Sequence, residues 1–133
     1  MQYLLMICLD REAFDALPQE ERIAIHRDCG AWHEELVRSG HTLNFAGLHG
    51  PSAATTIRQR GGQTFVTDGP YIESKELLGG FEWIQADNLD EAIAIASRFP
   101  GLRAGIAVEV RPVVSDHERG KFCPKSMEEV VAR

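Results

Sequence analysis

The spacing of apolar residues changes along the chain, and each change marks an expected strand or helix. Residues 3–9 are almost wholly apolar, which predicts a strand that is central in its sheet. Residues 17–39 begin with Pro and Glu, carry an apolar stripe at helical spacing and are followed by Gly40, which predicts a helix with a defined end. The stripe that should face the core consists of Ile25, Cys29, Trp32 and Leu36.

The rest of the chain supplies further strands and a second helix. Gly61-Gly62 lies between two segments rich in strand formers, 55–60 and 63–67, and predicts a tight β-hairpin. Asn88 and Glu91 have the spacing of a capping box, in which Asn88 caps the helix that follows and the Glu91 side chain reaches back. Three other strands are expected, over residues 41–49, 79–86 and 104–110.

The expected element order is strand, helix, strand, hairpin, strand, helix, strand. Two βαβ-like halves predict an α+β fold of the ferredoxin-like type (βαββαβ) with an inserted β-hairpin, and both helices on one face of an antiparallel sheet. Apolar residues alternate on both faces of the strands, so the uncovered face needs a cover, and a second copy of the chain is the simplest one. We therefore expect a homodimer.

Composition and charge limit the kinds of binding partner and the cellular compartment that we expect for this protein. With 133 residues the chain is one domain by size, and its net charge of −6 repels a phosphate backbone, so no nucleic-acid partner is expected. The apolar runs are strand-sized, which argues against a membrane partner, and the N-terminus lacks the features of a signal peptide. Three scattered cysteines without a Cys-x-x-Cys pair indicate a reducing compartment, so a cytoplasmic protein is expected.

A bend at Asp68 organises the centre of the chain. Asp-Gly-Pro combines a side chain that can bond the backbone, a residue that tolerates positive φ and a ring that fixes the exit direction. Bends fixed this firmly often carry binding groups, and charged residues crowd around this one. They are Asp68, Glu73, Lys75 and Glu76.

This stretch resembles a known family signature. The segments that carry the resemblance are Asp68-Gly69-Pro70-Tyr71, Glu73-Ser74-Lys75-Glu76 and Leu78-Gly79-Gly80-Phe81. They are similar to the motif of the DGPF-domain branch of the YCII-related family, with Tyr71 where the name-giving pattern has Phe. The resemblance implies a ferredoxin-like domain over 1–112 that dimerises into an α/β barrel. Residues 113–133 are then a C-terminal tail, in which Ser126 begins a possible short helix.

The resemblance also implies a site. In YCII-related proteins the suspected active site pairs an Asp at the end of the first strand with a His near the start of the first helix, and Asp10 matches the Asp. The matching helix position holds Cys29, which we expect to be an inert buried thiol because it lies on the core stripe. The nearest histidines are His26, one turn before, and His33, one turn after.

His26 and His33 lie on one side of the same expected helix, with Gly30 between them. Their separation corresponds to about 10.5 Å of helical rise, which is too great for a shared metal ion. Two interpretations stay open for each histidine: a half-buried residue at the edge of the core, or an imidazole that moves a proton on a ligand held next to Gly30. His117 and Cys123 give only a weak metal signal, so no metal site is predicted.

The candidate chemistry is acid–base catalysis without a cofactor, such as isomerisation or elimination on a small polar or aromatic molecule, because no phosphate-binding loop, nucleophile elbow or dinucleotide fingerprint is present. The catalytic candidates are Asp10 or Asp68 as base or orienter and His26 or His33 as proton carrier. The ligand-binding candidates are Arg58, Tyr71, Lys75 and Glu76, with Arg58 or Lys75 holding developing negative charge.

Plainer interpretations stay open for these residues. Asp10 can be an ordinary loop residue, and Arg58 and Arg60 can occupy a solvated face of their strand. The alternative function is a ligand-binding or regulatory module without turnover. The resemblance supports this alternative, because relatives are often encoded or fused beside sigma factors of the extracytoplasmic-function type.

Overall fold

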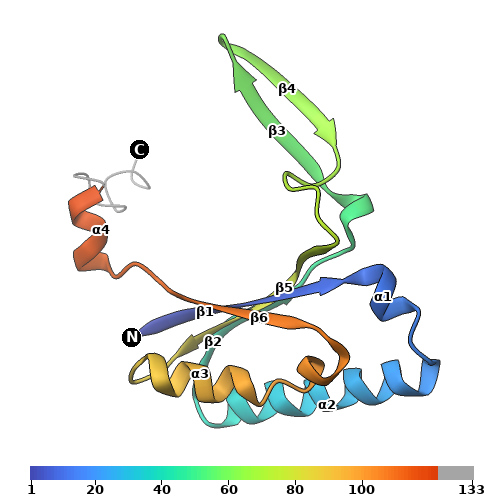
Figure 1. Ribbon diagram of the computed structural model, residues 1–133. Helices are drawn as coiled ribbons and strands as arrows, with labels where there is room; N and C mark the ends of the chain where they lie inside the picture. Colours follow the sequence, from blue (N-terminus) through green and yellow to red (C-terminus); the bar gives the residue numbers. More distant parts are fainter. Residues whose placement is uncertain (123–133) are drawn as a thin grey trace.

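The computed structural model describes residues 1–122, which form a four-stranded sheet, a separate two-stranded hairpin and four helices (Figure 1). The strands are β1 (Gln2–Asp10), β2 (Thr42–Gly47), β3 (Thr55–Arg60), β4 (Gln63–Asp68), β5 (Glu76–Gln85) and β6 (Ala107–Pro112). The helices are α1 (Arg11–Asp15), α2 (Gln19–Arg38), α3 (Leu89–Ser97) and α4 (Asp116–Phe122), and short 3-10 turns span Pro51–Ala53 and Pro100–Ala104. The expected strands and the two longer helices are confirmed in order and type.

The four-stranded sheet has the order β2-β5-β1-β6, and all neighbouring strands are antiparallel. α2 therefore joins two strands that are separated by β5, and α3 joins two strands that are separated by β1. Figure 1 shows both helices on one face of this sheet, with the opposite face uncovered. This is the α+β, ferredoxin-like arrangement that the element order predicts.

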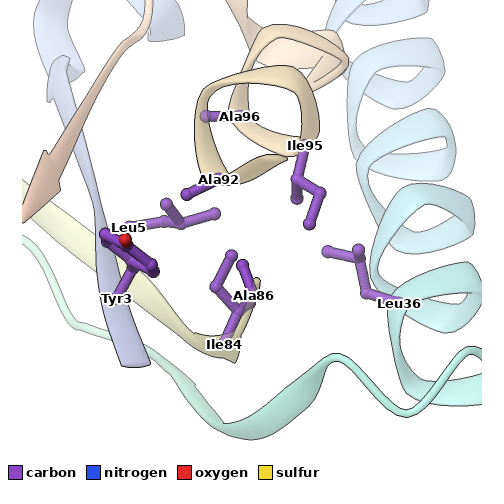
Figure 2. Close-up of a cluster of buried hydrophobic side chains, with 8 residues drawn as sticks. All are labelled: Tyr3, Leu5, Leu36, Ile84, Ala86, Ala92, Ile95 and Ala96. Atoms are coloured by element: carbon purple, nitrogen blue, oxygen red, sulfur yellow. The ribbon is translucent and has the colours of Figure 1, made fainter. Parts of the chain in front are cut away.

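Alternate residues of the strands point toward the helices and form the core. Tyr3 and Leu5 of β1 and Ile84 of β5 point toward the helices and are 2%, 0% and 0% exposed. Figure 2 shows these side chains facing α3, with Leu36 of α2 at one side of the cluster. The α3 residues in the cluster are Ala92, Ile95 and Ala96. Because full burial of one large apolar side chain is worth about 1.5–3 kcal/mol, this layer holds the helices on the sheet.

The predicted core stripe of α2 is confirmed. Ile25 and Leu36 are buried, and Cys29 and Trp32 between them are half-buried. The Trp32 ring stands edge-on to Phe99 with centroids 5.1 Å apart, and its Nε1–H donates to a carbonyl oxygen of α3 at 3.2 Å. One face of α2 thus packs against the rest of the domain from Ile25 to Leu36.

The β3–β4 hairpin forms an arm that leaves the main sheet on the side away from α2 and α3 (Figure 1). Gly61 and Gly62 make its turn with φ angles of +56° and +78°, which favour glycine, so the predicted hairpin is confirmed. Ile57 and Val66 face each other across it, and each is 68% exposed. A two-stranded hairpin is at best marginally stable by itself, so this arm carries apolar surface that lacks a cover within residues 1–122.

Several element boundaries differ from the expected ones; β5 begins at Glu76 rather than Gly79, and β2 ends at Gly47 rather than His49. The loop expected after β1 contains α1, because the Asp10 carboxylate accepts a hydrogen bond from the Ala13 N–H at 3.1 Å and caps this short helix. The last strand begins at Ala107 rather than Ala104, because Ala104 ends a 3-10 turn that Gly105 closes with φ of +82°. An apolar run in the sequence does not distinguish such a turn from a strand.

The capping box at α3 is only half formed. The Asn88 side chain accepts from the Glu91 N–H at 2.9 Å, as predicted. The Glu91 carboxylate does not reach back to Asn88, because it accepts instead from the His41 Nε2–H at 3.0 Å. In the tail, α4 was not expected, whereas the helix expected from Ser126 lies outside the described residues.

Candidate functional site

A cavity of about 750 Å³ lies between α2 and the four-stranded sheet. β1, β2 and β5 contribute one side of it, and α1 and α2 contribute the other. Its lining is mainly apolar and includes Ile7, Phe14, Phe45, Phe99 and Ile106. A mainly apolar cavity of this volume, with a few polar groups, is typical of a small-molecule site.

Glu82 is the buried charged residue of the sheet, with 4% exposure. Its position in β5, between Gly80 and Ile84 on the helix-facing side, forces the carboxylate into the core. A carboxylate buried without hydrogen bonds is costly, and two donors satisfy this one. The His33 Nδ1–H donates to both Glu82 oxygens, at 2.8 and 3.0 Å, and the Thr42 hydroxyl donates to Oε2 at 2.9 Å.

The contact with Glu82 orients the His33 ring. Because a carboxylate only accepts hydrogen bonds, Nδ1 carries the proton and Nε2 is left to exchange a proton with another molecule. Nε2 has no hydrogen-bond partner within residues 1–122. The ring also packs on Phe45 with centroids 4.0 Å apart, so two contacts fix its position. His33 and Glu82 form an oriented acid–base pair at the edge of the cavity.

One stripe of α2 faces the cavity. Its members are Arg22, His26, Cys29 and His33, which lie within about 60° of one another around the helix. Gly30 lies beside this stripe, and a methyl group added to Gly30 would meet no atom within 4 Å. Gly30 is exposed and lines the cavity, as the interpretation with a ligand beside Gly30 requires.

His26 and Cys29 differ from His33 in their surroundings. The His26 ring stands edge-on to Phe14 with centroids 5.5 Å apart, and no carboxylate within the described residues bonds to it. Burial raises the pKa of the Cys29 thiol above its ordinary value, and this effect outweighs the opposing hydrogen bond from the Gly101 backbone. Cys29 is thus a protonated thiol at neutral pH, in agreement with the inert thiol expected from the sequence.

The structure places Asp10 and Lys75 together but apart from the histidines of α2. Asp10 caps α1 and, with Lys75, lines a separate cavity of about 410 Å³. Glu76 pairs with Asp10 in the strand register. Within residues 1–122 no hydrogen bond joins Asp10 to a histidine, so the structure does not assemble the Asp–His pair that the family resemblance implies.

The candidates on the arm lie apart from both cavities. Asp68 ends β4 as an exposed residue, and its predicted bond to the backbone is absent from the described hydrogen bonds. The Arg58 guanidinium lies 5.0 Å from the centre of the Tyr71 ring rather than beside a carboxylate. Gly69 takes φ of +109°, as the predicted bend requires. The structure supports Asp68 as a residue of the bend.

Glu82, Thr42 and Phe45 were not among the residues expected at the site. Alternation along β5 placed Glu82 on the side of Ile84, so a charged residue at a core-facing position was a usable signal. The sequence does not predict which residue bonds to Glu82, because the contact with His33 depends on how α2 packs on the sheet. Within residues 1–122 no group of three or more His, Cys, Asp or Glu side chains could hold a metal ion.

Comparisons with known proteins identify the family. A profile of the YCII-related domain matches residues 1–115. The chain belongs to the YCII-related family. It is 34% identical over 114 residues to an uncharacterised protein of Rhizobium meliloti (strain 1021), and the match covers 85% of this chain and 92% of the relative. None of the described helices has the length and apolar character needed to cross a membrane.

A solved structure shares the fold. It is the 5-chloro-2-hydroxyhydroquinone dehydrochlorinase of Burkholderia phenoliruptrix AC1100 in complex with 2,5-dihydroxybenzoquinone, with a TM-score of 0.51 and 18% sequence identity. The match covers 88% of this chain and 98% of that chain. At 18% sequence identity, this match shows that the two proteins share an α+β fold.

Proposed function

We propose that the chain binds a small molecule with an apolar body in the cavity beneath α2 and transfers a proton on it without a cofactor. The observation that carries this proposal is the His33–Glu82 pair on the cavity lining. A buried carboxylate on one ring nitrogen leaves the other free for the substrate, which is how general bases are commonly oriented. Of the two histidines considered from the sequence, His33 has this partner.

The chemistry follows from the geometry of the pair. His33 Nε2 accepts a proton from a C–H or O–H bond of the substrate, and the electron pair of that bond stays on the substrate. The imidazolium that forms lies 2.8 Å from the Glu82 carboxylate, which compensates its charge. If the substrate carries a leaving group, the electron pair expels it as an anion, which is an elimination. If it does not, the proton returns to another atom, which is an isomerisation.

The solved neighbour supports this class of reaction. Its name describes a dehydrochlorinase, and loss of HCl is an elimination. Its ligand, 2,5-dihydroxybenzoquinone, is a hydroxylated ring, and a cavity of about 750 Å³ has room for such a molecule. We therefore propose hydroxylated ring compounds as the first substrates to test.

The test is turnover by matched histidine variants. Hydroxylated quinones and chlorinated hydroquinones are screened by thermal shift, and their conversion is followed by ultraviolet absorbance and chloride release. His33→Gln is expected to lower turnover by about 100-fold or more, the usual contribution of a general base. His41→Gln is the control, because His41 also contacts a glutamate, Glu91, but does not line this cavity. Unchanged turnover in His33→Gln contradicts the proposal.

The rival proposal is binding without turnover, including a regulatory role linked to sigma factors. The mainly apolar lining of the cavity favours it, since retention of a ligand needs no base. The same experiment separates the two functions. Ligands that stabilise the protein, remain chemically unchanged and bind His33→Gln as tightly as the unaltered protein indicate a binding module.

We also propose that the chain is a DGPF-branch homodimer. The sheet face away from α2 and α3 carries apolar side chains that are only half-buried, and the arm exposes Ile57 and Val66 beyond it. The half-buried residues are Leu4, Met6, Phe81 and Trp83. A second copy placed face to face covers both surfaces and gives the dimeric α/β barrel expected from the family resemblance.

A further inference from the structure

Arg22 places a cation at one end of the cavity and carries a buried donor with no partner. The residue lies in the first turns of α2 and lines the cavity, and its Nε atom is buried without a hydrogen-bond partner among residues 1–122. An arginine stays charged in a protein, so this N–H is always a donor. Native structures leave few buried donors unpaired, and each needs an explanation.

The nearby protein groups do not neutralise Arg22. Arg11 also lines the cavity, and none of the ion pairs formed within the described chain involves either arginine. Asp15 lines the same cavity but lies beyond ion-pair distance of both. The Glu82 carboxylate is occupied by His33 and Thr42. This end of the cavity therefore carries a net positive charge, from Arg11 and Arg22 against Asp15.

Arg22 and His33 mark the two ends of one helical stripe. They are eleven positions apart on α2, which places them about 20° apart around the helix and about 16 Å apart along it. His26 and Cys29 lie between them on the same stripe. A ligand that meets both ends must therefore be elongated and apolar in its middle, with an acceptor at the end near Arg22.

We propose that the ligand is an organic carboxylate whose anionic group binds Arg22, while its apolar, ring-bearing body extends toward His33. This inference rests on the proposed function, because it uses the same cavity, and it narrows the ring compounds proposed there to those that carry a carboxylate. A guanidinium donates N–H bonds to the two oxygens of a carboxylate, and an anion bound there would balance the charge of Arg22, which no ion pair among residues 1–122 neutralises. The apolar lining favours a carboxylate on a ring system over a strongly hydrated phosphate.

Matched acids and amides test the charge of the ligand. Benzoate, 2-naphthoate and biphenyl-4-carboxylate are each titrated against their neutral amides by calorimetry. At least one acid is expected to bind about 10-fold or more tightly than its amide, as a charged hydrogen bond provides. Arg22→Gln is expected to abolish this preference, whereas Arg38→Gln, which removes a charge from the far end of the same helix, keeps it. A preference that survives in Arg22→Gln, or no binding by any acid, overturns the inference.

The ligand-free protein supplies a second readout. Arg22→Met keeps most of the side-chain volume and removes the unpaired donor, so the melting temperature is expected to stay the same or rise. A lower melting temperature or a changed mass in light scattering shows that Arg22 already has a partner in the protein or in a second copy, which contradicts the proposal. His33→Gln separates the two proposals, because it is expected to stop turnover and to leave the preference for acids intact.

Discussion

At the scale of single residues, the buried carboxylate of Glu82 decides what the cavity can do. It holds His33 and Thr42 at hydrogen-bond distance, and its 4% exposure excludes most of the water that would compete with them. His41 and Glu91 make a similar pair at 3.0 Å, but their side chains are 32% and 33% exposed. Only the first pair combines a dry environment with contact to a cavity.

Loss of the Glu82 carboxylate is expected to cost stability as well as function. Glu82→Ala leaves the Nδ1–H of His33 and the hydroxyl of Thr42 without their acceptor, so the free energy of unfolding should fall by about 1–3 kcal/mol or more. Glu91→Ala is the matched control and should cost less than about 1 kcal/mol, since its ion pair is partly exposed. Urea denaturation measures both, and equal effects would contradict the assigned roles.

Cys29 gives the cavity a chemical reporter. Because burial raises its pKa, less thiolate is present at neutral pH than in an exposed cysteine, and alkylation by iodoacetamide should be slow and should speed up as the pH rises. A cavity ligand should slow it further, since Cys29 lines the cavity. Mass spectrometry of a Cys8→Ser, Cys123→Ser variant measures the rate. Alkylation faster than that of free cysteine would contradict the burial of this thiol.

At the scale of elements, periodicity predicted the parts of the fold that carry long patterns. α2 has twenty residues, and β1 and β5 have nine and ten, so each of these elements is long enough to show a clear apolar pattern. That pattern predicts where each element lies in the sequence. α1 has only five residues and depends on one cap, so it has no pattern to detect. The same limit applies to the site. One helix is enough to predict that His26 and His33 lie on the same side of α2, whereas the pairing of His33 with Glu82 depends on two elements packed together.

The same substitution should have opposite effects at two glycines. Gly30→Ala adds a methyl group where no atom lies within 4 Å, so removing glycine from the interior of α2 should raise the free energy of unfolding by about 0.5–1 kcal/mol. Gly80→Ala would place Cβ 2.8 Å from the Ala46 carbonyl oxygen of the neighbouring strand and should lower it by about 1–3 kcal/mol. Thermal unfolding of the two variants checks both signs, and destabilisation by Gly30→Ala would contradict the open space.

At the scale of the whole molecule, the uncovered sheet face and the arm argue for a second copy. Light scattering is expected to give a mass of two 14.8 kDa chains. Met6→Glu should shift this to one chain, because Met6 lies on the uncovered face and a carboxylate buried there against a second copy would lose its hydration. Ile93→Glu is the control, since Ile93 is 46% exposed on α3, on the helix side of the sheet. A folded single chain before any substitution would contradict the dimer.

A small molecule bound beneath α2 is expected to meet the free nitrogen of His33. The most direct measurement is an NMR spectrum of the imidazole nitrogens during titration with biphenyl-4-carboxylate, with His33→Gln used to assign the signals. We expect an Nδ1–H tautomer for neutral His33, a large shift of its Nε2 signal on binding and little change at His41. Calorimetric binding that leaves the His33 signals in place would contradict it.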